Sequence, residues 1–254
     1  MKTFFCALIA ILWFSSVYAQ APDGLRIMQE SFWRDDGQDA YFKSQMVLID
    51  KNRNERKRVF ELYTKDYGAL ARSFIKFLEP ADIAGISFLS WENESGYDTQ
   101  YLYLPALGRS RRIVSSQKSL KFVNSDFTYE DMQRRRPERD EHKLLGEEQL
   151  GQWQCYVVES ASKDPGDSQY SKRVSWVDKK SKMIVRIDFY DKKAGLAKRL
   201  SVKTLKEQQG IWTAMETEVA DLIDNHKTLI IVKDAKYNLG IDDEIFTQRH
   251  LEQN

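Results

Sequence analysis

The sequence has little cysteine, histidine and proline, with 2, 3 and 5 residues of each. Cys6 lies within residues 1–19, so a chain that loses this segment keeps only Cys155 and can form no internal disulfide. The histidines His142, His226 and His250 are scattered without metal-ligand spacing, and no zinc motif is present. The hydrophobic core alone must therefore hold the fold, and no metal site is expected.

The signatures of the common enzymes are also missing. The chain has no G-x-S-x-G elbow, no P-loop and no G-x-G-x-x-G. Its formal net charge is +1, and this excess disappears if Lys2 is removed, whereas nucleic-acid binders usually carry a strongly basic face. Cys155 lies in an apolar run, where a buried small hydrophobe is expected rather than a reactive thiol. We therefore expect no enzyme activity, no cofactor and no nucleic-acid partner.

Residues 1–19 have the order of a secretory signal. Lys2 precedes the uncharged apolar run Phe4–Phe14, and small residues follow, with Val17 and Ala19 at the positions that signal peptidase reads. The run is shorter than the ~20 residues that span a bilayer. We predict cleavage between Ala19 and Gln20, giving a secreted protein without a lipid anchor, since no cysteine follows the small residues.

The remaining residues, 20–254, are dominated by short segments typical of strands. A helix is predicted from the cap Asp23 to about Trp33, because Leu25, Met28 and Phe32 recur at helical spacing. Aromatic and β-branched residues then predict about eleven strands. These strands are expected at residues 41–49, 58–63, 70–78, 86–91, 100–104, 155–158, 173–177, 184–190, 200–205, 212–219 and 228–232.

Tight spacing between these segments favours antiparallel neighbours, because parallel strands need long crossovers. Residues 106–141 differ from the predicted strands, because they are rich in arginine and acidic residues and contain the helix breaker Pro137. We expect short helical turns or an ordered excursion from the sheet in these residues. No repeat, low-complexity tract or linker is visible, so one domain with a single curved antiparallel sheet is favoured over two domains.

Several predicted strands are apolar on both faces. In residues 70–78, Phe74 lies on one face while Ile75 and Phe77 lie on the other. A sheet with one solvated face should alternate between apolar and polar residues. Helices could cover the second face, but the one predicted helix and the excursion are little cover for eleven strands. We therefore expect a concavity that receives an apolar ligand.

A set of motifs stands out in the segments Phe77–Leu89, Tyr101–Leu107, Arg111–Ile113, Ser125–Asp131, Cys155–Val158 and Trp176–Asp178, with Phe246 and Leu251. Together they resemble the outer-membrane lipoprotein-sorting family, whose fold is related to that of the periplasmic lipoprotein carrier LolA. The resemblance covers the chain after residue 19. One departure is Asn124, where the family tends to have glycine before Ser-Asp-Phe; asparagine also tolerates a positive φ.

The resemblance implies a half-barrel with helices over its concave face and an apolar hollow for acyl chains. It also implies a periplasmic, monomeric binding or carrier protein in lipid or lipoprotein sorting. Related proteins are often encoded beside exporters of the resistance-nodulation-division type, which suggests such an exporter as a partner. A second interpretation stays open: an accessory subunit of the exporter that acts by protein contact, with its hollow filled by its own helices.

Two sets of candidate site residues follow. Arg109, Arg111 and Arg112 are expected to meet lipid phosphates or an acidic partner near the mouth of the hollow, because guanidinium groups suit phosphate; the alternative is a solvated loop. The candidate lining was chosen as large apolar residues on one face of each strand. It consists of Phe60, Leu62, Phe74, Phe88, Tyr101, Tyr103, Trp176, Met183 and Phe189.

Overall fold

The computed structural model describes residues 23–193 and 195–253, so the predicted signal and its cleavage site lie outside the described residues. Two α-helices are present, α1 Gly24–Phe32 and α2 Gln248–Glu252, with six short 3-10 turns. The turns are Pro105–Leu107, Ser115–Gln117, Phe122–Asn124, Pro137–Arg139, Pro165–Asp167 and Asp243–Phe246. The strands are β1 Asp39–Ile49, β2 Glu55–Tyr67, β3 Leu70–Glu79, β4 Ser87–Trp91, β5 Thr99–Leu104, β6 Arg109–Arg112, β7 Asp140–Leu150, β8 Trp153–Ser162, β9 Lys172–Asp178, β10 Ile184–Tyr190, β11 Leu196–Gln208, β12 Ile211–Asp221 and β13 His226–Tyr237.

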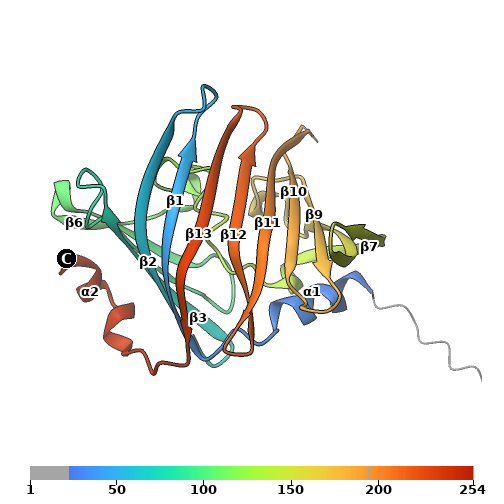
Figure 1. Cartoon of the computed structure of the whole chain (residues 1–254), viewed down its shortest axis with the longest axis horizontal. Coiled ribbons are helices and arrows are strands. Elements are labelled where there is room, and N and C mark those ends of the chain that lie inside the picture. Colours follow the sequence, from blue (N-terminus) through green and yellow to red (C-terminus); the bar gives the residue numbers. More distant parts are fainter. Residues whose placement is uncertain (1–22, 194, 254) are drawn as a thin grey trace, which may run out of the picture.

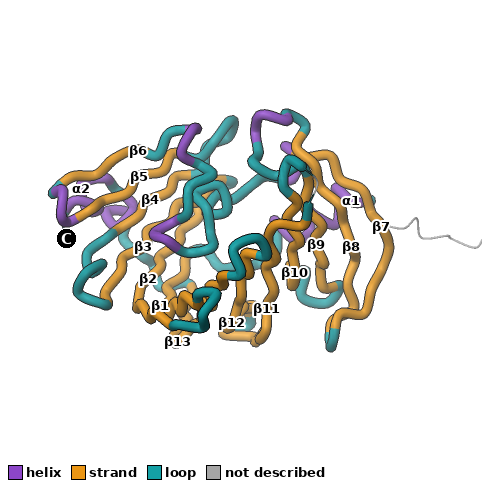
Figure 2. Tube along the Cα trace, turned by 90° about the horizontal axis from the view of Figure 1, so that it is seen from above, coloured by secondary structure: helices purple, strands orange, loops and turns teal. Residues whose placement is uncertain are grey.

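All of these strands form one antiparallel sheet. Its order is β6-β5-β4-β3-β2-β1-β13-β12-β11-β10-β9-β8-β7, and the sheet is not closed, because β6 and β7 have no strand beyond them in the order. Seen from above, the sheet curves into a deep trough (Figure 2). The predicted mainly-β fold with a single curved antiparallel sheet is therefore confirmed, with 13 strands where about eleven were expected.

The order of the strands requires one segment of the chain to cross the trough from one edge of the sheet to the other. The chain meanders outward from β1 to the edge strand β6, and later meanders back from the opposite edge strand β7 to β13, which pairs with β1. The link between the two edges is residues 113–139, called the crossing segment below. Figure 2 shows it lying across the open side of the trough.

The predicted first helix is also confirmed. The Asp23 carboxylate accepts a hydrogen bond from the Arg26 amide at 2.7 Å, which caps α1 as expected. Ile27 and Met28 then pack on Val158 and other apolar residues of β8 and β9. Gly24 permits a close approach to β7, because a Cβ there would meet backbone atoms of that strand at 3.0 Å. Among the described residues, no helix has the length and apolar character needed to cross a membrane.

Both faces of the β3–β5 region are covered by the chain itself. On the concave face, Phe88 packs with Phe122 and Tyr129 of the crossing segment. On the convex face, Phe74 packs with Phe246 and Leu251 of the C-terminal segment. The apolar residues Phe74, Ile75 and Phe77 on the two faces of β3 are therefore explained by packing within the protein.

The two strands that the sequence failed to predict are the edges. β6 has the sequence Arg-Ser-Arg-Arg, and β7 is rich in charged residues and contains Gly146, so neither shows apolar alternation. Charged side chains are a common way to protect an edge strand from pairing with other chains. Residues 106–141 contain the short helical turns that were expected, as 3-10 turns, but β6 and the start of β7 also lie within them.

Candidate functional site

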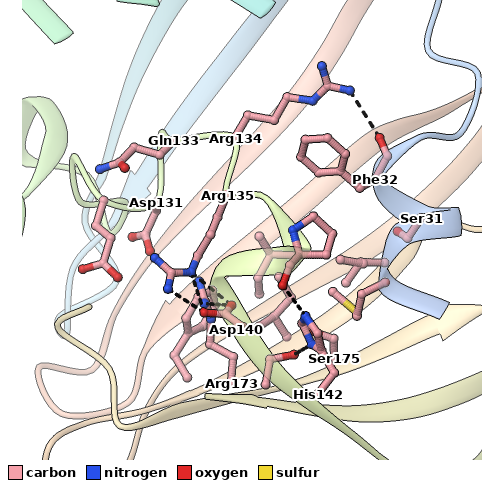
Figure 3. Close-up of a pocket in the computed structure, with 18 of the residues that line it drawn as sticks. Ser31, Phe32, Asp131, Gln133, Arg134, Arg135, Asp140, His142, Arg173 and Ser175 are labelled. Atoms are coloured by element: carbon pink, nitrogen blue, oxygen red, sulfur yellow. Dashed lines mark hydrogen bonds and ion pairs between the residues drawn. The ribbon is translucent and has the colours of Figure 1, made fainter. Parts of the chain in front are cut away.

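The concave side of the sheet, called the hollow below, contains two cavities. The first measures about 460 Å³ and lies between α1, the crossing segment and β7–β12 (Figure 3). The second measures about 400 Å³ and lies over β1–β3, β12 and β13. Arg34, Asp36 and Arg134 line both, so the two cavities adjoin. Their volumes are in the usual range for sites that take small organic ligands.

Much of the lining is apolar and only half-buried, which is expected for side chains that border empty space. Ile187 and Leu200 reach the first cavity from β10 and β11, and Phe42, Leu62 and Ile230 reach the second from β1, β2 and β13. The remaining apolar lining residues are Met28, Phe32, Phe127, Ile184, Phe189 and Val219 in the first cavity, and Ala40, Phe60, Ala71, Met132, Met183, Trp212, Ala214 and Val232 in the second.

Charged residues also line the first cavity, and most of them form close pairs. The Arg135 guanidinium donates to both carboxylate oxygens of Asp140, and Arg173 donates to the same carboxylate at 2.5 Å (Figure 3). Arg135 also contacts Asp167 at 3.0 Å. Burial lowers the pKa of Arg173, while the nearby Asp140 opposes that shift. These groups stabilise each other and give the cavity wall little net charge.

A second buried pair ties the crossing segment to the sheet. The Lys198 ammonium of β11 donates to the Asp131 carboxylate, and the Tyr170 hydroxyl donates to the same carboxylate at 2.9 Å. Burial and the neighbouring Asp131 raise the pKa of Tyr170. The backbone and hydroxyl of Thr128 also donate to Asp131. Asp131 therefore fixes the crossing segment over the first cavity.

The two arginines at the junction of the cavities are paired more loosely. Arg34 lies 3.8 Å from Asp36, and Arg134 lies 3.5 to 3.9 Å from its three nearest carboxylates. Burial lowers the pKa of Arg34, and its Nε atom is buried without a hydrogen-bond partner. Arg134 stacks over the Phe32 ring at 4.5 Å. The junction thus places two guanidinium groups between the cavities.

Two groups that could offer acid-base or nucleophilic chemistry, His142 and Cys155, are constrained by their surroundings. His142 lines the first cavity, but its ring nitrogens bond to Ser160 and to the Pro137 carbonyl, each at 2.8 Å, and burial lowers its pKa. Cys155 is fully buried on the side of β8 that faces away from the first cavity, and burial raises its pKa to about 11. Within residues 23–193 and 195–253, no group of three His, Cys, Asp or Glu side chains could hold a metal ion.

Some of the predicted lining residues do border the hollow. Phe60, Leu62 and Met183 line the second cavity, and Phe189 lines the first. The structure does not bring the other five to either cavity. Phe88 is fully buried in the core beneath the crossing segment, and Phe74, Tyr101 and Tyr103 pack on the convex face with the C-terminal segment. Trp176 also points to the convex face, because the neighbouring Ser175 lines the first cavity.

The predicted arginine cluster lies elsewhere. Arg109, Arg111 and Arg112 are exposed on the edge strand β6, which pairs with β5. The sequence interpretation did not anticipate the charged pairs of the hollow, although the charges between Glu130 and Asp140 were visible. Their partners, such as Arg173 and Lys198, come from strands far away in the sequence, so pairing could not be inferred from spacing.

The Ser125–Asp131 motif has a structural role. The buried Asp126 carboxylate accepts hydrogen bonds from Thr228 of β13 at 2.7 Å and from the His226 ring at 2.8 Å. Asn124, where related sequences tend to have glycine, has a φ of 58°, as its tolerance of positive φ predicted. The motif therefore anchors the crossing segment to the middle of the sheet.

Comparison with known proteins agrees with this architecture. A family model described as an uncharacterized protein matches residues 70–253. The chain is 31% identical to a DUF1329 family protein from Desulfovibrio piger, over 90% of this chain and 97% of that one, with a TM-score of 0.85. It is 30% identical to an outer membrane lipoprotein-sorting protein domain from Vibrio parahaemolyticus, over 91% and 98% of the chains, also with a TM-score of 0.85.

A LolA superfamily protein from Nitrosomonas europaea has the same fold at 17% identity, with a TM-score of 0.71 over 91% of this chain and 100% of that one. The comparison with curated proteins gave no match. The curved sheet and its covered concave face therefore define a LolA-like fold. More narrowly, the chain belongs to the DUF1329 family, and the resemblance seen in the sequence is confirmed.

Proposed function

We propose that this protein binds the acyl chains of a lipid or lipoprotein in its hollow and carries them within the periplasm. One observation carries the proposal: two adjoining cavities lie on the concave side of the sheet, the first of them beneath the crossing segment and α1, and half-buried apolar side chains share the lining of both with polar groups. The similarity to a lipoprotein-sorting domain from Vibrio parahaemolyticus supports the same class of ligand.

The energy of burial is sufficient for such a role. Each buried CH₂ group contributes about 0.8 kcal/mol, so a sixteen-carbon chain gains about 12 kcal/mol before the cost of ordering it. Half-buried side chains such as Leu62 and Ile230 can shift rotamer to fit chains of different length. The polar junction at Arg34 and Arg134 suits the polar end of an amphiphile, while the acyl chain follows the apolar walls.

The proposed role is non-enzymatic. The charged groups of the first cavity are held in pairs, as in Arg135–Asp140–Arg173, and such pairs lower the reactivity of each member. His142, which could otherwise act as an acid or base, is engaged at both ring nitrogens. The groups of the hollow are thus suited to shaping a binding site.

A periplasmic location follows from the signal-like residues 1–19 together with the lipoprotein-sorting relative. We propose that the chain is exported, is cleaved after Ala19, and works as a monomer that exchanges its ligand with an inner-membrane exporter of the resistance-nodulation-division type. N-terminal sequencing of periplasmic material tests the cleavage, and an intact Met1 would contradict it.

One observation favours the second candidate, a protein-binding subunit of the exporter. Phe122 and Tyr129 of the crossing segment already fill the concave face over β4, so part of the hollow is closed by the protein itself. Mass spectrometry of lipid that co-purifies from the periplasm separates the two functions. A stoichiometric lipid or acylated peptide supports the carrier, and its absence from freshly isolated protein supports the subunit.

A further inference from the structure

Three aliphatic side chains are exposed together at one end of the sheet. Leu222 and Ile223 lie in the turn between β12 and β13, and they are 41% and 64% exposed. Leu120 of the crossing segment is 51% exposed, and the adjacent Lys121 contacts Asp221 and Asp224 of that turn, each at 3.2 Å. We call Leu120, Leu222 and Ile223 the apex patch.

The shape of the turn presents this patch outward. The Asp221 carboxylate accepts hydrogen bonds from the amides of Ile223 and Asp224, each at 3.0 Å, and so holds the turn in one conformation. Lys121 also approaches the buried Asp126 at 3.8 Å. The acidic groups around the patch are therefore engaged by a cation, while the apolar side chains face outward.

Basic residues flank the apex patch. β1 pairs with β13 up to Ile49 and Lys227, so the β1–β2 turn lies beside the β12–β13 turn, and Figure 1 shows both turns at the same end of the sheet. The Asp50 carboxylate of this turn is folded back onto Asn52 and Asn54. Lys51 and Arg53 are exposed in this turn, and Arg56 and Lys57 are exposed at the start of β2, where Lys57 pairs with Glu55 at 3.4 Å. Lys192 and Lys193 occupy the β10–β11 turn at the same end (Figure 1).

An apolar tip surrounded by basic side chains is the pattern of a surface that docks on an anionic membrane. We propose that this end of the sheet docks on the surface of a bilayer that contains anionic phospholipids. The apex patch enters the interface between headgroups and acyl chains, and the β1–β2 and β10–β11 turns contact lipid phosphates.

The apex patch is connected along the chain to the lining of the first cavity. β12 runs directly from Val219, which lines the first cavity, to the turn that holds Leu222 and Ile223. The crossing segment likewise connects Leu120 with Phe127, another lining residue. A docked molecule would thus bring the end of its hollow to the membrane surface. The docking itself does not require that the hollow binds lipid.

Co-sedimentation of the full chain, freed of residues 1–19, with vesicles tests the proposal. Phosphatidylcholine vesicles are compared with vesicles that contain about 30 mol % phosphatidylglycerol, at low and high salt. We expect binding to the anionic vesicles only, weakening with salt. Leu222→Ser/Ile223→Ser and Lys51→Glu/Arg53→Glu should each reduce binding about tenfold or more, with melting temperatures close to that of the wild type because all four residues are exposed.

Matched controls lie toward the opposite end of the sheet. Leu239→Ser removes a side chain that is 51% exposed after β13, and Lys206→Glu/Lys236→Glu reverses two exposed charges near the other ends of β11 and β13. Both controls should bind like the wild type. The proposal is overturned if wild-type protein does not bind anionic vesicles, if the controls weaken binding equally, or if the apex variants lose only the association with a membrane protein.

Discussion

The Asp126 carboxylate of the crossing segment accepts a hydrogen bond from the Thr228 hydroxyl of β13 at 2.7 Å, and both side chains are fully buried. This contact joins the segment that covers the hollow to the centre of the sheet. Thr228 also accepts a hydrogen bond from the Asp126 amide at 3.0 Å. The cover of the hollow is therefore fastened at the point where the two halves of the sheet meet.

Thr228→Val keeps the shape of this side chain but removes its hydroxyl. Asp126 then loses one partner while it stays buried, and a buried polar group without its partner costs about 1–3 kcal/mol. We expect the free energy of unfolding to fall by that amount in chemical denaturation. Thr217→Val on β12, a half-buried threonine, serves as the control and should have a much smaller effect. If both variants lose the same free energy of unfolding, the hydrogen bond between Thr228 and Asp126 does not stabilise the fold in the way described.

Stability should also depend on pH through Lys118. Its ammonium is buried without a hydrogen-bond partner, and burial lowers its pKa to about 8 from the usual 10.5. Between these two values the unfolded chain binds more protons than the folded one, so the free energy of unfolding should rise with pH. The expected gain from this residue is about 2 kcal/mol between pH 8 and 10.

Lys118→Met measures this contribution by difference. The variant should lack the gain, so its stability relative to the wild type should decrease steadily from pH 8 to pH 10 in urea unfolding experiments. Because other groups titrate equally in both proteins, the comparison isolates Lys118. A constant difference across this range would show that the ammonium is not destabilised by burial.

The Arg109, Arg111 and Arg112 cluster of β6 gives a separate prediction. Reversal of all three charges should weaken association with anionic lipid or with the inner-membrane partner, chiefly at low salt, because exposed charges are screened within about 10 Å at 0.1 M. Vesicle binding and pull-down of the exporter at two salt concentrations measure this. If both are unchanged, the cluster is a solvated edge that protects β6 from pairing. If the triple reversal abolishes vesicle binding while the apex variants bind normally, the membrane-binding surface lies at β6 and not at the apex patch.

The fold could be predicted largely because its central strands carry clear apolar and β-branched patterns. The edges β6 and β7 could not, because their charged residues show no alternation. The pairing of β1 with β13 joins the two ends of the sheet-forming chain. No local sequence pattern specifies a pairing between segments so far apart in the chain. The route of the crossing segment over the hollow therefore could not be predicted from the sequence.

The site was less predictable than the fold, since adjacent residues on a strand face opposite sides. Phe88 shows the consequence: its side chain is large, apolar and on the concave face, but it packs against Phe122 and Tyr129. Phe88→Asp would therefore unfold the protein instead of reporting on lipid. Ile230 was not among the predicted lining residues, but it lines the second cavity and is only half-buried.

Ile230 and its neighbour Ile231 provide the most direct test of the carrier proposal. The two side chains point to opposite faces of β13, and both are half-buried, but only Ile230 reaches the hollow. Ile230→Asp would place a charge where the acyl chain is proposed to lie, and an unpaired charge in an apolar site is costly. Ile231→Asp makes the same change on the outer face.

The decisive measurement is the amount of lipid bound to each protein purified from the periplasm, by mass spectrometry, with the melting temperature of the same samples. We predict that the wild type and Ile231→Asp retain lipid, whereas Ile230→Asp loses most of it and melts within a few degrees of Ile231→Asp. Absence of lipid from the wild type, or equal retention by both folded variants, would contradict the proposal that the hollow binds acyl chains.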